Sequence, residues 1–226
     1  MKDTLNFIRD LVANNNREWF NANKERYLGV RKDLEVLTLQ LIAGLSEFEP
    51  AAARMQPAEC MYRIYRDTRF SLDKTPYKNH IGIYISPFGG KKSQFGGYYL
   101  HLEPDRCAVA GGVWCPTAPV LKAMRQSIYD NVEEYLEIIN DAEFKERFPV
   151  VGENLLKTVP KGFPKDWEHI DLLRPRSFTV MASLDNNTVC SGRLVQRVVD
   201  DFRLMKPFND FLNYTFEENP ELPRTF

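Results

Sequence analysis

Apolar positions near the start of the chain recur at helical spacing, and those over 5–12 predict a short first helix. Asn15 is expected to cap a second, long helix, because Glu18 then takes the third helical position of a capping-box pattern. This helix is expected to end before Pro50. Its apolar stripe comprises Phe20, Tyr27, Val30, Leu34, Leu37, Leu41, Leu45 and Phe48.

The middle of the chain changes to short segments in which apolar and polar residues alternate, the pattern of strands with one buried face. A glycine-rich linker over 87–97 and other short connections favour antiparallel pairing, because parallel strands need long crossovers. The expected strands cover 62–65, 80–86, 98–103, 107–113 and 176–184.

Helical spacing returns toward the end of the chain. One helix is expected over 120–140 and, after a loop-rich stretch, another over 186–203. Pro207 is expected to separate the latter from a last short helix over 208–216. Strands in the middle and helices at both ends predict a single α+β domain over residues 1–226. Its core should be a mainly antiparallel sheet of about five strands, flanked by N-terminal and C-terminal helices.

Composition narrows the classes of function. Lys and Arg (30) nearly balance Asp and Glu (31), and a net charge of −1 disfavours a protein that coats nucleic acid. No apolar run approaches the roughly 20 residues that span a bilayer, and no secretory signal opens the chain, so we expect a cytoplasmic protein without a membrane partner. The four cysteines form no C-x-x-C pair, the three histidines lack zinc-site spacing, and no nucleotide fingerprint is present. Neither a metal nor a cofactor is therefore expected.

Positive charge is concentrated in the segment 60–80, CMYRIYRDTRFSLDKTPYKNH. Five cationic side chains against two carboxylates give this segment a local net charge of +3, which leaves −4 for the rest of the chain. Arginine carries a planar fork of donors that fits phosphate or carboxylate oxygens two at a time. The segment therefore predicts a site for a phosphorylated or otherwise multiply anionic small molecule. The expected binding residues are Arg63, Arg66, Arg69, Lys74, Tyr77 and Lys78.

Four side chains are candidates for catalysis at this site. Asp67 and Asp73 could hold the arginines in position or act as general bases. His101 and Glu103 are two residues apart in an expected strand, so they share one face and could form a wall of the site. Phosphoryl transfer or phosphoester hydrolysis is the chemistry that suits these groups, because it depends mainly on positioning and charge stabilisation.

The central motif resembles the signature of a conserved hypothetical family, domain of unknown function 2461. The motif R-x-x-R-D-x-R-F-x-x-D-K-x-x-Y runs from Arg63 to Tyr77 without a departure. Similar segments lie at 15–20, 97–104, 111–114 and 161–163, so the resemblance covers most of the chain. The resemblance implies that the motif is a site, and it implies no activity.

Two alternatives stay open. In the first, the same arginines form an interaction module for an acidic protein or, less favoured, for nucleic acid. Lys91 and Lys92 would help them, and the stacking surfaces would be Tyr62, Tyr65, Phe70 and Tyr77. In the second, the motif is purely structural, a network of ion pairs that ties the segment to neighbouring helices.

Overall fold

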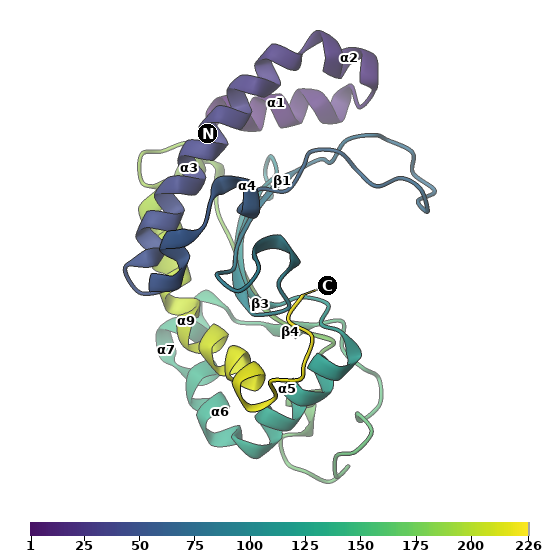
Figure 1. Ribbon diagram of the computed structural model, residues 1–226, viewed down its shortest axis with the longest axis vertical. Helices are drawn as coiled ribbons and strands as arrows, with labels where there is room; N and C mark the ends of the chain where they lie inside the picture. Colours follow the sequence, from purple (N-terminus) through teal and green to yellow (C-terminus); the bar gives the residue numbers. More distant parts are fainter. Residues whose placement is uncertain (226) are drawn as a thin grey trace.

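The computed structural model describes residues 1–225, in which nine α-helices and one five-stranded sheet form an α+β fold (Figure 1). The strands are β1 (Ile81–Ile85), β2 (Gly97–Leu102), β3 (Ala108–Val113), β4 (Val151–Glu153) and β5 (Ser177–Ser183). The helices are α1 (Lys2–Ala13), α2 (Arg17–Ala22), α3 (Lys24–Ser46), α4 (Pro57–Cys60), α5 (Ala118–Asp130), α6 (Val132–Asn140), α7 (Ala142–Arg147), α8 (Asn186–Val189) and α9 (Leu194–Glu218). The predicted fold class is confirmed.

The strands follow the order β1-β2-β3-β5-β4, and every neighbouring pair is antiparallel. Four of the five predicted strands are confirmed to within one or two residues. The fifth prediction, over 62–65, corresponds to a segment that pairs with its neighbour only through isolated bridges. The short edge strand β4, which shows a register irregularity against β5, lies in the stretch expected to be loop.

One face of the sheet packs against α9, which in turn packs against α3. The Tyr98 ring lies 5.2 Å from that of Phe202 in α9. Its cross-strand partner Gly111 lacks a side chain at the place where the Met205 side chain approaches the sheet. Leu100, Val109 and the other residues of this face are buried. The main hydrophobic core therefore lies between this face and α9.

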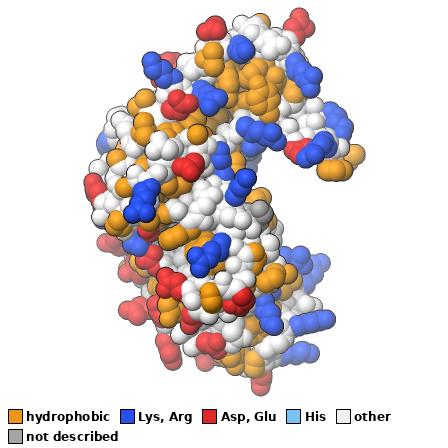
Figure 2. Space-filling view, in the orientation of Figure 1, with side chains coloured by type: hydrophobic (Ala, Val, Ile, Leu, Met, Phe, Trp, Pro, Cys, Tyr) orange, Lys and Arg blue, Asp and Glu red, His pale blue; other side chains and the backbone are white. Residues whose placement is uncertain are grey.

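Residues that alternate with these point to the opposite face of the sheet. Tyr84, Tyr99 and His101 are only half-buried there, and Met181 is exposed. Beside the sheet, α1, α2 and the segment 63–78 project to one side (Figure 1). Figure 2 shows a hollow on this side of the molecule, bordered by several Lys and Arg side chains. We refer to the face of the sheet that carries Tyr84, Tyr99 and His101 as the open face.

A single helix, α9, replaces the two helices that Pro207 was expected to separate. A proline inside a helix loses one backbone hydrogen bond and costs about 3 kcal/mol. The carbonyl without its usual partner belongs to Arg203, and both Arg203 and Pro207 are exposed. Met205 and Phe208, on either side of the proline, are fully buried. Packing of the flanking turns therefore overrides the local break.

The predicted cap at Asn15 is also wrong. Asn16 caps the short helix α2, and its side chain accepts a hydrogen bond from the Trp19 amide at 2.9 Å. The helical run is then interrupted at Asn23, where α3 begins anew. Asn131 likewise divides the helix expected over 120–140 into α5 and α6. Among the helices of residues 1–225, none combines the length and apolar character needed to cross a membrane.

Candidate functional site

The segment 61–83 doubles back on itself as an irregular antiparallel hairpin that leads into β1. Bridges pair Met61 with Ile83 and Tyr65 with Tyr77. Between them, the Lys78 amide donates to the Ile64 carbonyl at 2.9 Å. We call the part that adjoins the sheet, 61–65 with 77–83, the hairpin root, and 66–76, beyond the Tyr65–Tyr77 bridge, the hairpin tip.

The root is held against the N-terminal helices through Tyr77. The Asn15 amide group donates to the Tyr77 carbonyl at 3.0 Å and accepts from the Tyr77 amide at 3.1 Å, as a neighbouring strand would. The Tyr77 ring is buried and stacks on Phe20, with 4.1 Å between centroids. Tyr77 therefore positions the root by packing. Its expected role as a hydroxyl donor to a ligand stays a prediction.

The charged side chains of the tip bond to partners within the tip. Arg66 donates to Asp73 and to the Thr75 hydroxyl. Arg69 forms a two-pronged ion pair with Asp67, at 3.0 and 2.6 Å. The Lys74 ammonium donates to a backbone carbonyl at 2.9 Å. These three cationic side chains thus have separate internal partners instead of converging on one cavity with Arg63.

The two tip carboxylates are strongly stabilised in their ionised form. Hydrogen bonds from Arg69 lower the pKa of Asp67 to about 2. The pKa of Asp73 is lowered to about 2 by the Thr75 backbone amide first and then by Arg66. General bases work best with a pKa near the operating pH, so both groups are better suited to orienting arginines than to accepting protons.

Apolar side chains at the tip lie in solvent. Phe70 is 97% exposed and Leu72 is fully exposed. The guanidinium of Arg69 lies over the Phe70 ring, 5.9 Å from its centroid. The tip therefore offers an aromatic ring and a cation together.

Three other cationic side chains, those of Arg63, Lys78 and Lys91, lie close together at the root. The Lys78 ammonium lies over the Tyr62 ring, 5.2 Å from its centroid. Lys91 reaches the same place from the β1–β2 connection, where it donates to the Met61 carbonyl at 2.7 Å. Burial lowers the pKa of Lys78, and the nearby charges of Arg63 and Lys91 lower it further. Within residues 1–225, none of these three cations forms an ion pair with a carboxylate.

A chain of hydrogen bonds runs along β2 on the open face. The Tyr99 hydroxyl lies 3.0 Å from Nδ1 of His101, and Nε2 of His101 lies 2.9 Å from a Glu103 oxygen. This order of groups resembles the nucleophile–histidine–carboxylate arrangement of hydrolases, with a phenol in the first position. The expected shared face of His101 and Glu103 is observed.

His80 joins this chain from the start of β1. Its ring stacks on that of His101, with 4.5 Å between centroids. The Asn79 side chain donates to Glu103 at 2.9 Å, and its oxygen lies 2.9 Å from Nδ1 of His80. Burial lowers the pKa of His80 to about 4, with smaller contributions from His101 and Lys78, so its imidazole is neutral at pH 7.

Gly82 makes room for the two phenol rings at this place. A methyl group there would lie 2.6 Å from the Tyr99 hydroxyl and 3.1 Å from the Tyr62 ring. Gly82 is the cross-strand neighbour of His101, so the root, the phenols and the histidines occupy one patch of the open face. We call this patch the root site: Tyr62, Arg63, Lys78, Asn79, His80, Lys91, Tyr99, His101 and Glu103.

Residues 3–211 match the family described as Conserved hypothetical protein (DUF2461). The chain belongs to this family. No curated protein and no solved structure matches it. The DUF2461 match spans the N-terminal helices, the whole sheet and most of α9, so it includes both the hairpin and the root site.

The root site of this DUF2461 protein differs in part from the site predicted for its arginine motif. Sequence reasoning found Arg63, Lys78, His101 and Glu103 but missed Asn79. It assigned Tyr62 and Lys91 only to the alternative interaction module, and it left His80 and Tyr99 outside the expected site. The missing signal was strand pairing. Once β1 and β2 are paired antiparallel, Gly82 opposite His101 brings His80 and Tyr62 beside β2.

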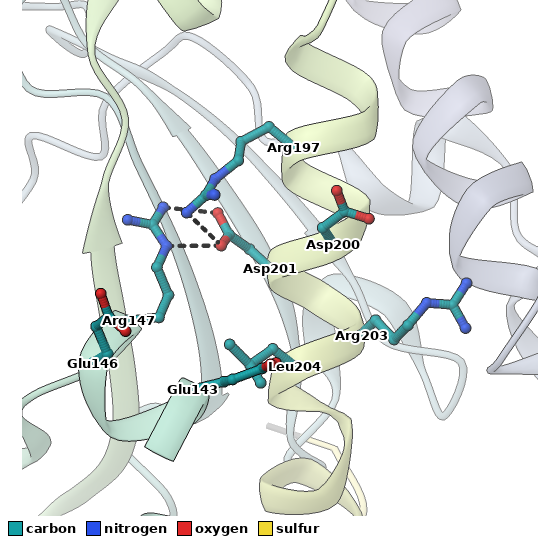
Figure 3. Close-up of a pocket in the computed structure, with 8 residues that line it drawn as sticks. All are labelled: Glu143, Glu146, Arg147, Arg197, Asp200, Asp201, Arg203 and Leu204. Atoms are coloured by element: carbon teal, nitrogen blue, oxygen red, sulfur yellow. Dashed lines mark hydrogen bonds and ion pairs between the residues drawn. The ribbon is translucent and has the colours of Figure 1, made fainter. Parts of the chain in front are cut away.

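A surface depression on the helical side of the DUF2461 fold has a different character (Figure 3). It lies between α7 and α9, where Asp201 is 3% exposed and accepts two 2.7 Å hydrogen bonds from Arg147. Arg197 adds a third contact at 3.1 Å. The buried carboxylate is therefore fully paired, and this network serves to fasten α7 to α9.

Proposed function

We propose that this DUF2461 protein binds a multiply anionic small molecule, of the phosphorylated class, at the root site. Arg63 and Lys78 are the side chains that hold the anion, with Lys91 beside them. The proposal keeps the ligand class expected from the sequence and moves its centre from the three arginines to the root of the hairpin.

The observation that carries this proposal is the half-buried ammonium of Lys78. Among residues 1–225 it has no carboxylate partner, and two further positive charges are close enough to lower its pKa. Burial and like charges both disfavour the charged form of a lysine. A bound anion with several oxygens would remove both penalties, since it would accept hydrogen bonds from the ammonium and the Arg63 guanidinium.

The neighbouring side chains suit phosphoester hydrolysis as the reaction class. His101, held between Tyr99 and Glu103, is placed to move a proton at the edge of the cationic patch. Asp67 and Asp73 have a supporting role in this scheme, because their low pKa values keep them ionised within the tip.

A titration of the full chain with pyrophosphate tests the binding step. Lys78→Met should weaken binding about 10–100-fold, which corresponds to loss of a charge-assisted hydrogen bond of about 1.5–3 kcal/mol. Lys165→Met, a change of the same kind in an exposed loop, is the matched control and should leave the affinity unchanged. Equal affinities for the wild type and Lys78→Met would dismiss the assignment.

A second candidate function rests on the tip. Phe70 and Arg69 form an exposed ring and cation of the kind on which unpaired bases stack. Binding of a single-stranded oligonucleotide should then weaken steeply with salt, linearly in log concentration, and Phe70→Ala should reduce it. A flat salt response, or an unchanged affinity in Phe70→Ala, would exclude this interaction module.

A further inference from the structure

Three side chains with metal-ligand chemistry meet at the root site. His80, His101 and Glu103 each offer one ligand atom, and these atoms all lie within 4.8 Å of one another. Ligand atoms on one tetrahedral zinc ion lie roughly 3.3 Å apart, given Zn–N distances of about 2.0–2.1 Å. The Nε2 of His101 and a Glu103 oxygen are already 2.9 Å apart. The wider pairs would have to close from at most 4.8 Å to about 3.3 Å to meet on one ion.

The partners of Asn79 determine which nitrogen His80 presents. Its NH₂ group must face the Glu103 carboxylate, because a carboxylate only accepts hydrogen bonds. The amide oxygen therefore faces Nδ1 of His80 at 2.9 Å, so Nδ1 carries the proton. Nε2 keeps its lone pair, which is the form in which imidazole binds a metal. One asparagine thus orients two of the three donors.

Tyr99 has the corresponding role for His101. Its hydroxyl lies 3.0 Å from Nδ1, and a hydroxyl can accept a hydrogen bond as well as donate one. Without a metal, Nε2 of His101 donates to the Glu103 carboxylate and Nδ1 accepts from the Tyr99 hydroxyl. An ion that takes the Nε2 lone pair leaves the proton on Nδ1, where the Tyr99 hydroxyl accepts it. A hydrogen-bonded partner on the far nitrogen of each histidine is the usual support of metal-binding imidazoles.

We propose that His80, His101 and Glu103 bind a divalent first-row transition ion, with Asn79 and Tyr99 holding the ligands in position. Two imidazole nitrogens and one carboxylate suit zinc or iron and disfavour magnesium and calcium, which prefer oxygen ligands alone. Three protein ligands leave coordination positions open, as in catalytic zinc sites. The sequence led us to expect no metal, because spacing along the chain does not show that β1 and β2 place His80 on His101.

Zinc binding by the full chain, stripped of metal with a chelator and titrated by calorimetry without phosphate, tests this site. The wild type should bind one Zn²⁺ per chain. His80→Ala, His101→Ala and Glu103→Gln should each lose more than the roughly 10–100-fold in affinity that removal of a partner of a metal ligand costs. Asn79→Ala should fall within that 10–100-fold range.

The chain supplies its own controls. His169→Ala removes the third histidine, which packs on Trp167 outside the root site, and should leave zinc affinity unchanged. Cys115→Ser and Cys190→Ser remove the exposed thiols, which could also take up zinc, and should likewise leave it unchanged. Thermal melting without metal identifies any variant that fails to fold. If His101→Ala fails to fold, Glu103→Gln still tests the site, because it keeps the shape of the side chain.

Absence of zinc binding by the wild type would overturn the proposal, as would binding that survives in His80→Ala and Glu103→Gln or disappears in Cys190→Ser. Since no anion is present, either result is independent of the pyrophosphate titration.

Discussion

The two faces of the sheet use the same strands for opposite purposes. On the covered face, Tyr98 and its neighbours are buried under α9. On the open face, Tyr99 and His101 are half-buried. Tyr99 is hydrogen bonded to His101, which is hydrogen bonded in turn to Glu103. Consecutive residues of β2 therefore alternate between core packing and a chain of polar contacts.

This contrast separates stability from binding by residue position. Changes on the covered face should alter the free energy of unfolding and leave ligand affinity in place. Changes to the polar side chains of the open face should chiefly alter ligand affinity and cost less stability, because half-buried polar groups contribute less to stability than a fully buried ring does.

The largest effect on stability is expected from Phe202→Ala on the covered face. The ring is fully buried against Tyr98, and loss of a buried phenylalanine costs about 3–5 kcal/mol. Denaturant unfolding measures this change. Tyr99→Phe, on the other face of the same strand, should cost about 0.5–1.5 kcal/mol and weaken zinc binding instead. Similar losses of stability from the two variants would remove the contrast between the faces.

Two glycines, one on each face of the sheet, allow a matched comparison in which the expected loss of stability is intermediate. A methyl group at Gly82 would lie 2.6 Å from the Tyr99 hydroxyl, and one at Gly111 would lie 2.6 Å from the Met205 sulfur. Each overpacked variant should lose about 1–3 kcal/mol of stability. Only Gly82→Ala should also weaken zinc binding, because it displaces Tyr99 from His101. Equal zinc affinities in Gly82→Ala and Gly111→Ala would refute this expectation.

An effect of similar size, but confined to one part of the chain, is expected from Asn15→Ala, which removes both side-chain hydrogen bonds to the Tyr77 backbone. The expected loss is about 1–3 kcal/mol, and it should be concentrated in the hairpin. Amide hydrogen exchange should accelerate over 64–78 and stay unchanged in α9. Acceleration spread evenly over the chain would mean that the root is not held separately.

The smallest effect concerns the tip carboxylates. The pKa of Asp67 and that of Asp73 are lowered to about 2, below their usual 3.8, so the ionised forms are favoured in the folded chain. Any order they give the tip is present above about pH 4 and is lost as the pH falls toward 2. Carboxyl chemical shifts in an NMR titration should show both midpoints well below 3.8. Midpoints near 3.8 would mean that the tip network does not form in solution.

Strand positions were predictable from the sequence because alternation over short runs is a local signal, as in 98–103. The ends of the helices were less predictable from the sequence. At Pro207, burial of Phe208 and its neighbours overrides the local break, and burial depends on which element lies opposite. Asn15 could serve as a cap by sequence, yet it pairs with Tyr77 across 62 residues of chain.

The candidate site was predictable in content but not in assembly. A charge count identifies the motif, but it does not show that Asp67 forms an ion pair with Arg69, and Asp73 with Arg66, within the tip. The approach of His80 to His101 depends on the register of β1 against β2. Spacing rules for metal sites look for pairs of ligands a few residues apart, and His80 is far from His101 along the chain.

Anomalous diffraction at the zinc edge, from crystals of the full chain grown with Zn²⁺, tests most directly whether the open face is a ligand site. The account predicts a peak bounded by the imidazoles of His80 and His101 and the carboxylate of Glu103. No peak there, or strong peaks only at Cys115 or Cys190, would contradict it.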